Sequence, residues 1–218
     1  MRSACAGAAP GKTLVVTAGV HGCEYVGIQA LRRLAADLDP ARLSGNVILL
    51  PLANPSAFYA GAKQVVPEDG VNLNRAFPGN SAGPLSARLA FALEAALYPE
   101  ADLLADLHSG DCSETLHPLV FFPAAGKKMV NQVSLDAAKV LTVPYRVRST
   151  AKNGLYSWAV QRDIPALLIE RGGRGFGLNR RWTPAVRTSA PCCAIWRLCP
   201  EEPAAGSAGD HRNLLCRS

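Results

Sequence analysis

Apolar residues along this chain alternate between short continuous runs and stretches with helical spacing. The continuous runs, rich in Leu, Val, Ile and Ala, predict buried strands at 14–18, 46–52, 103–107, 119–122 and 165–170. The helical spacing predicts helices at 24–38, 85–97, 127–141 and 155–162. Strands that alternate with helices in this way are typical of an α/β fold, with three layers around a mostly parallel or mixed twisted sheet.

One connection in this pattern is unusually long. After the run at 46–52, roughly 30 residues rich in Pro, Gly and Asn precede the next helix, whose first turn follows Pro84. Loops of this length within a compact domain are usually functional. We therefore expect part of a site in this segment.

The pattern changes towards the end of the chain. The length of 218 residues fits one domain, which we place at 1–175. Residues 176–218 lose the apolar periodicity, and they hold two of the three Trp and four of the seven Cys. We expect 176–218 to be an atypical tail, either disordered or the product of a shifted reading frame or a truncated gene.

Charge and composition exclude several classes of protein. The net charge of +6 would suit a nucleic-acid partner, but 176–218 contribute half of it, and the body has no basic run interleaved with aromatics. No run approaches the roughly 18 apolar residues of a membrane helix. The start lacks the apolar core of a signal peptide, so we expect a cytoplasmic protein without nucleic-acid or membrane partners. No Cys-x-x-Cys pair occurs, which predicts free thiols rather than a zinc ribbon.

Three predicted strands end at residues with metal-binding or acid–base chemistry. His21 and Glu24 follow the strand at 14–18 through a glycine-rich turn, Asp106 and His108 close the strand at 103–107, and Glu170 closes the last strand. The carboxyl ends of strands are where open α/β sheets bind ligands. His21, Glu24 and His108 would hold one zinc ion and leave a fourth position open, as in hydrolytic sites. Asp106 is placed to orient an imidazole.

Two further features fit such a site. Glu170 follows an apolar run, which raises the pKa of a carboxyl group and suits a general base. Asn74 and Arg75 lie in the long connection and combine an amide with a guanidinium fork, which suits a substrate carboxylate. Structural alternatives remain for each residue: the histidines as ordinary buried side chains, Glu170 paired with a nearby Arg, and Arg75 in a surface ion pair.

Four motifs in order resemble those of the succinylglutamate desuccinylase/aspartoacylase family, a branch of the zinc carboxypeptidase-like hydrolases. They are HGCE at 21–24, DGVNLNRAFPG at 69–79, DLHSG at 106–110 and LIE at 168–170. The resemblance covers roughly 11–175. It implies zinc ligands at His21, Glu24 and His108, a catalytic carboxylate at Glu170, and binding of a substrate carboxylate by Asn74 and Arg75.

The resemblance also implies an activity. It predicts a deacylase that cleaves the amide of a small N-acyl amino acid; the alternatives are a carboxypeptidase or a non-catalytic, metal-binding remnant. Members of the family commonly carry an additional Arg before the Asn-Arg pair, where this chain has Pro67 and Glu68, with Lys63 the nearest upstream basic residue.

Overall fold

The computed structural model describes residues 2–174, so the tail predicted at 176–218 lies outside the described residues. Within the described part, the main sheet consists of β1 (Ser3–Ala6), β2 (Ala9–Ala18), β3 (Ser44–Leu50), β6 (Leu103–His108), β7 (Thr115–Pro123), β8 (Tyr145–Ser149) and β9 (Ala166–Gly173). The helices are α1 (Tyr25–Asp37), α2 (Pro55–Ala60), α3 (Leu85–Leu97), α4 (Lys128–Val140) and α5 (Leu155–Gln161). Two short strands, β4 (Val65–Val66) and β5 (Val71–Asn72), form a separate hairpin.

The sheet has the strand order β1-β3-β2-β6-β9-β7-β8. Its centre is parallel, because β3, β2, β6 and β9 all run in the same direction. β1 pairs antiparallel with β3, and β7 pairs antiparallel with β9. The sheet is therefore mixed with a parallel core, which confirms the predicted fold class.

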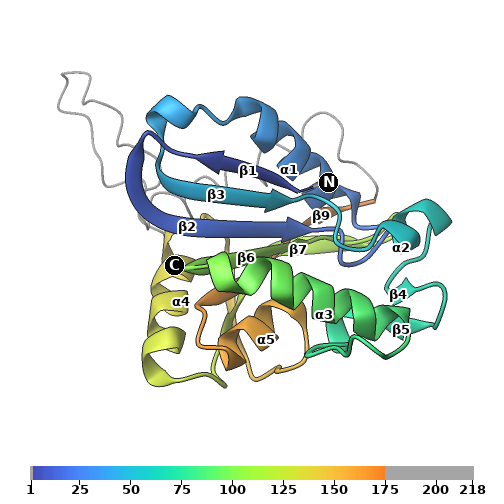
Figure 1. Ribbon diagram of the computed structural model, residues 1–218. Helices are drawn as coiled ribbons and strands as arrows, with labels where there is room; N and C mark the ends of the chain where they lie inside the picture. The colour runs from blue at the N-terminus through green and yellow to red at the C-terminus, as the bar shows by residue number, and fades with distance from the viewer. Residues whose placement is uncertain (1, 175–218) are drawn as a thin grey trace.

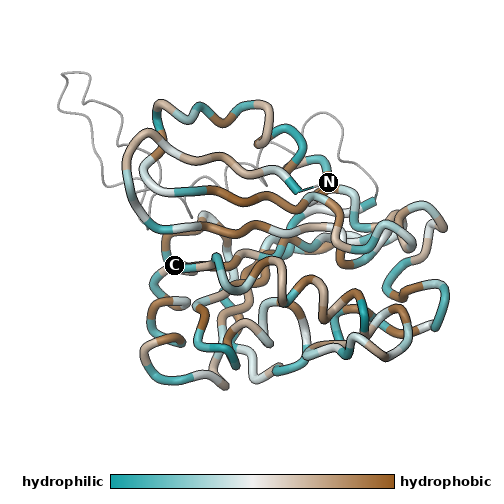
Figure 2. Tube along the Cα trace, in the orientation of Figure 1, coloured by the Kyte–Doolittle hydropathy of each residue, from teal (hydrophilic) through white to brown (hydrophobic). Residues whose placement is uncertain are grey.

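Helices cover both faces of this sheet. Figure 1 shows α1 above the strands and α3 and α5 below them. Ile28, Leu31 and Leu34 of α1 join one apolar cluster, and Leu93 and Leu97 of α3 join a second cluster on the opposite face. The central strands are hydrophobic along most of their length (Figure 2), because both of their faces are buried.

Each predicted strand and helix is present, although β2 begins at Ala9 and β7 at Thr115, before their predicted starts at 14 and 119, and the structure differs from the prediction in three further places. The long connection is not a plain loop, since it contains α2, the β4–β5 hairpin and a 3-10 turn at Leu73–Arg75. β1 and β8 were not predicted from the pattern. The last strand runs on to Gly173, so Glu170 lies within β9 rather than at its end, and strand pairing fixes its backbone position.

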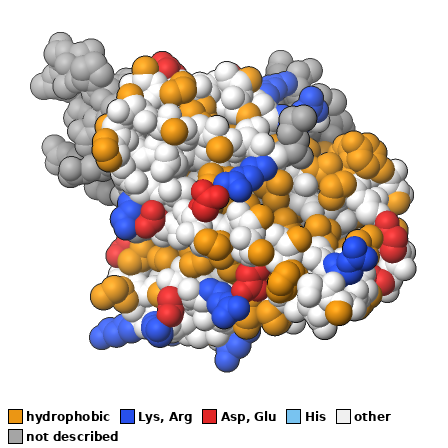
Figure 3. Space-filling model, viewed as in Figure 1, with side chains coloured by type: hydrophobic (Ala, Val, Ile, Leu, Met, Phe, Trp, Pro, Cys, Tyr) orange, Lys and Arg blue, Asp and Glu red, His pale blue; other side chains and the backbone are white. Residues whose placement is uncertain are grey.

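Two observations concern the surface. None of the helices among residues 2–174 combines the length and apolar character needed to cross a membrane. On the face seen in Figure 3, basic and acidic side chains are interspersed. Ion pairs among the described residues include Lys12 with Asp102 at 2.8 Å and Arg162 with Glu94 at 2.7 Å.

Candidate metal centre and substrate cavity

The turn that carries His21 and Glu24 is held against α2. Asn54, fully buried at the N-terminus of α2, donates its backbone N–H to Gly19 O at 2.9 Å and its side-chain amide to Val20 O at 3.3 Å. Gly22 is required here, because a Cβ at this position would lie 2.3 Å from the backbone carbon of Ala57. The close approach of α2 therefore fixes the position of the turn.

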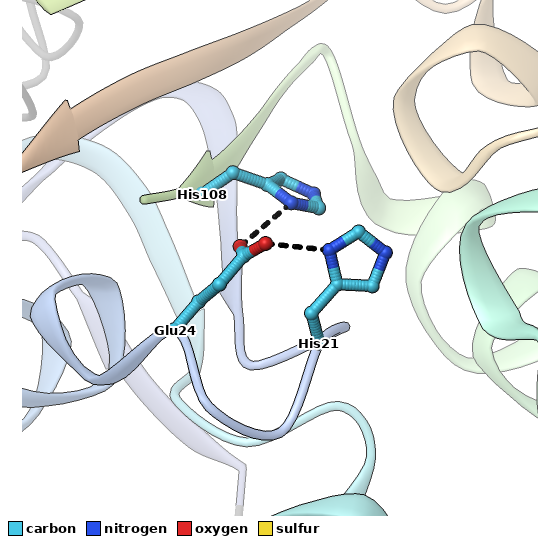
Figure 4. Close-up of side chains that lie close together, drawn as sticks. All are labelled: His21, Glu24 and His108. Carbon is cyan, nitrogen blue, oxygen red and sulfur yellow. Dashed lines mark hydrogen bonds and ion pairs between the residues drawn. The ribbon is translucent and has the colours of Figure 1, made fainter. Parts of the chain in front are cut away.

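His21, Glu24 and His108 converge on one point, and we call them the His–Glu–His cluster (Figure 4). Their potential ligand atoms all lie within 4.8 Å of one another. His21 Nδ1 lies 2.6 Å from Glu24 Oε1, and His108 Nδ1 lies 2.9 Å from Glu24 Oε2. Glu24 stands at the N-cap position of α1 but makes no side-chain capping hydrogen bond, so its carboxylate is directed to the two imidazoles.

Buried charges shift the pKa values within this cluster. Burial alone would raise the pKa of Glu24, but the charges and hydrogen bonds of His108 and His21 outweigh it and lower the pKa to about 2. Burial alone would lower the pKa of His108, but Asp106 and Glu24 raise it well above its usual value. The cluster is thus an electrostatically coupled group in which an anion and imidazoles stabilise one another.

The second nitrogen of each imidazole is also bound. Asp106, fully buried in β6, accepts from His108 Nε2 at 2.9 Å and from the Thr17 hydroxyl at 2.7 Å. Asn72 Oδ1 lies 3.1 Å from His21 Nε2 and accepts from Asn74 N at 2.8 Å. Both imidazoles are therefore oriented with Nδ1 towards Glu24. The sequence pattern indicated Asp106 but not Asn72, although Asn72 belongs to the same motif as Asn74.

Glu170 lies beside the cluster because of the strand register. It is the parallel pairing partner of His108 across β6 and β9. Its Oε2 is buried and accepts no hydrogen bond from the described part of the chain. Burial raises the pKa of Glu170 to about 7, with the charge of Glu24 adding to the rise and that of His108 opposing it. The carboxyl group can therefore change its protonation state near neutral pH.

A cavity of about 310 Å³ opens next to these residues. Its lining includes His21, His108 and Glu170 together with Arg75 and Tyr156. Arg75 places its positive charge in the same cavity as the His–Glu–His cluster, which suits a ligand carboxylate.

Asn74 is buried and fixed. Its Oδ1 accepts from Leu155 N at the start of α5 at 3.0 Å, and its backbone oxygen accepts from Arg75 Nη1 at 2.7 Å. Gly154 permits this contact, because a Cβ there would lie 2.4 Å from Asn74 Oδ1. In this structure Asn74 contacts Arg75 and also joins the long connection to α5.

A parallel-cored α/β sandwich with a His–Glu–His cluster at the carboxyl end of its strands defines the carboxypeptidase-like class. Residues 10–181 match the family model described as the succinylglutamate desuccinylase/aspartoacylase catalytic domain. The chain belongs to this succinylglutamate desuccinylase/aspartoacylase family.

Individual relatives agree with this assignment. The chain is 33% identical over 168 residues to an N-alpha-acetyl-L-2,4-diaminobutyric acid deacetylase of Halomonas elongata, covering 76% of this chain and 49% of that protein. The crystal structure of a succinylglutamate desuccinylase/aspartoacylase from Rhodobacter sphaeroides superposes with a TM-score of 0.82 at 28% identity, covering 95% of this chain and 62% of that one. The product-bound structure of the ectoine utilization protein EutE (DoeB) from Ruegeria pomeroyi superposes with a TM-score of 0.82 at 29% identity. This match covers 92% of this chain and 62% of that one. The chain thus spans about half the length of the curated relative and less than two thirds of these structures.

Proposed function

We propose that this chain is the catalytic part of a zinc-dependent deacylase that hydrolyses the amide bond of a small N-acyl amino acid. The observation that carries the proposal is the convergence of three groups on one cavity: the His–Glu–His cluster, the carboxyl of Glu170 and the guanidinium of Arg75. A deacetylase of an acylated amino acid and an ectoine utilization protein among the relatives support the same class of substrate.

The donor set fits one zinc ion. Two imidazole nitrogens and a carboxylate are the ligands of hydrolytic zinc sites, and the second nitrogen of each imidazole already has an oxygen partner. When bound, zinc in such a site lowers the pKa of the water at its open position to about 7 and polarises a carbonyl oxygen. The open side of the cluster faces the cavity, because both histidines line it.

The remaining groups supply binding and proton transfer. Arg75 binds the substrate carboxylate and so places the amide bond beside Glu170. Glu170, with its pKa raised to about 7 by burial, accepts a proton from the attacking water and delivers it to the leaving nitrogen. Hydrolysis thus yields a carboxylic acid and a free amine, with Glu170 returned to its starting state.

The size of the cavity favours a small amide over a peptide. The part lined by the described residues measures about 310 Å³, at the lower end of the roughly 300–1,000 Å³ typical of small-molecule pockets. A carboxypeptidase needs a groove that continues beyond the carboxylate-binding group. We therefore place peptide trimming second.

The test uses the purified chain of residues 1–218. We expect zinc at one equivalent by elemental analysis, loss of that zinc in a His21→Ala, Glu24→Ala double variant, and release of amine from N-acetyl amino acids but not from peptides. Glu170→Gln should keep its zinc and lose about 10²–10⁴-fold in turnover. A zinc-free wild type contradicts the metal assignment, and a fully active Glu170→Gln variant removes Glu170 from its role.

A further inference from the structure

One side of the cavity is formed by four neighbouring strands of the sheet, in the spatial order β6, β9, β7 and β8. The residues that line the cavity from these strands are His108, Leu168, Glu170, Phe121 and Ser149, and we call them the strand floor. His108 belongs to the His–Glu–His cluster and stands on the first of these strands. The rest of the strand floor therefore extends away from the metal ligands.

Two apolar side chains of the strand floor lie next to Glu170. Leu168 precedes Glu170 by two positions in β9, so the two side chains project from the same face of the sheet. Phe121 is the antiparallel pairing partner of Leu168, and both pack in the apolar cluster on the α3 side of the sheet. The surface beside the Glu170 carboxyl group is therefore hydrocarbon.

Positive charge is scarce in this cavity. Among the lining residues that the structure describes, Arg75 is the only Lys or Arg. Lys63, in the same long connection, does not line the cavity and pairs with Asp111 at 2.6 Å. The described part of the cavity thus holds one guanidinium for a ligand carboxylate, and a second carboxylate on the ligand would meet Leu168, Phe121 and the acidic Glu170.

We propose that this site selects N-acyl amino acids with a single carboxylate, which Arg75 binds, and with an uncharged group that packs on Leu168 and Phe121. The inference rests on the proposed function and names its substrate class. A second carboxylate, in the side chain or in the acyl group, would lose its hydration over hydrocarbon without gaining a cation. We expect this to weaken binding about 10–100-fold.

The test compares ligands of matched shape. The side chains of N-acetyl-L-leucine and N-acetyl-L-aspartate have the same size and branching but differ in charge. Affinity is measured by calorimetry on the Glu170→Gln variant of the chain 1–218, which keeps Arg75 and the metal ligands and slows turnover. N-acetyl-L-aspartate and N-succinyl-L-leucine should each bind about 10–100-fold more weakly than N-acetyl-L-leucine. Equal or tighter binding of either dicarboxylate, or no binding of N-acetyl-L-leucine, overturns the proposal.

A charge placed on the strand floor should change this order. Phe121→Arg, made in the same Glu170→Gln background, supplies a second cation and should bind N-acetyl-L-aspartate about tenfold more tightly. Tyr145→Arg is the matched control, because Tyr145 is 54% exposed in β8 and does not line the cavity. Equal affinities of the two variants for N-acetyl-L-aspartate overturn the role of Phe121, and the comparison of ligands stands without either variant.

Turnover by the zinc-loaded wild type separates this inference from the proposed function. We expect kcat/KM to follow the order of affinities, with N-acetyl-L-leucine ahead of both dicarboxylates. If the order of affinities holds but no ligand is hydrolysed, the proposed function fails and the selectivity of the cavity stands. If a dicarboxylate is hydrolysed faster than N-acetyl-L-leucine, this inference fails and the proposed function stands.

Discussion

His108 and Glu170 are direct pairing partners on the neighbouring parallel strands β6 and β9. These two residues are 62 positions apart in the sequence, and the pairing brings them together near the carboxyl ends of the central strands. His108 belongs to the His–Glu–His cluster, and Glu170 provides a buried carboxyl group beside it. The spacing between them is set by backbone hydrogen bonds, not by the side chains themselves.

Glu170 should make the metal-free protein less stable as the pH rises. The pKa of Glu170 is raised from 4.5 to about 7 in the folded state. Below about pH 4.5 the carboxyl is protonated in both the folded and the unfolded state, so folding does not have to bury a charged carboxylate. Between about pH 4.5 and pH 7 the unfolded state loses this proton while the folded state keeps it, so stability falls by about 3 kcal/mol in total and then stays constant above pH 7. Urea unfolding of the metal-free Glu170→Gln variant should lack this decline, while Glu100→Gln, at an exposed ion pair, should retain it. Equal pH slopes for Glu170→Gln and wild type would contradict the burial of this charge.

Asn72 should strengthen metal binding through His21. Because Asn72 Oδ1 accepts from a backbone N–H, its amide orientation is fixed, and His21 Nε2 must act as the donor, which leaves the Nδ1 lone pair for the metal. Asn72→Ala should weaken zinc binding about 10–100-fold in a chelator competition, and Asn72→Asp should restore it.

The matched control for Asn72 is Asn46→Ala, which removes an exposed amide in β3 far from the cluster. It should leave zinc affinity unchanged. If Asn72→Ala binds zinc as tightly as Asn46→Ala does, Asn72 has no part in orienting His21.

Thr17 should stabilise the fold through Asp106. Its hydroxyl donates to a fully buried carboxylate at 2.7 Å, and hydrogen bonds to charged groups contribute about 1.5–3 kcal/mol. Thr17→Val should lower the free energy of unfolding by about 2 kcal/mol in urea titrations. Thr142→Val, at an exposed position, serves as the control and should change stability by less than about 0.5 kcal/mol. A Thr17→Val protein as stable as the control would show that Asp106 is satisfied without this hydroxyl.

Gly22 should tolerate no side chain. A Cβ there would lie 2.3 Å from the backbone of Ala57, so Gly22→Ala must displace either the turn or α2, at a cost of about 3 kcal/mol. Gly70→Ala is the matched control: its φ of 68° strains an alanine, but nothing lies within 4 Å, so we expect a loss of only about 1 kcal/mol. Thermal melts compare the two variants. A smaller loss for Gly22→Ala than for Gly70→Ala would contradict the close packing of the turn.

The sequence alone determined the alternation of strands and helices, because residues buried on both faces of a parallel sheet form continuous apolar runs. It also indicated His21, Glu24, His108, Asp106 and Glu170, since polar residues directly after such runs are unusual. It did not reveal β1 or β8, which are edge strands with one exposed side and a weak apolar pattern.

Only the tertiary structure decided which of these residues meet. The parallel register places Glu170 beside His108, and the approach of α2 to Gly22 fixes the turn that carries His21 and Glu24. The contact of Asn72 with His21 joins two segments that are far apart in the sequence. Sequence periodicity reports how each element is buried, whereas long-range contacts depend on how the elements pack, which no local pattern encodes.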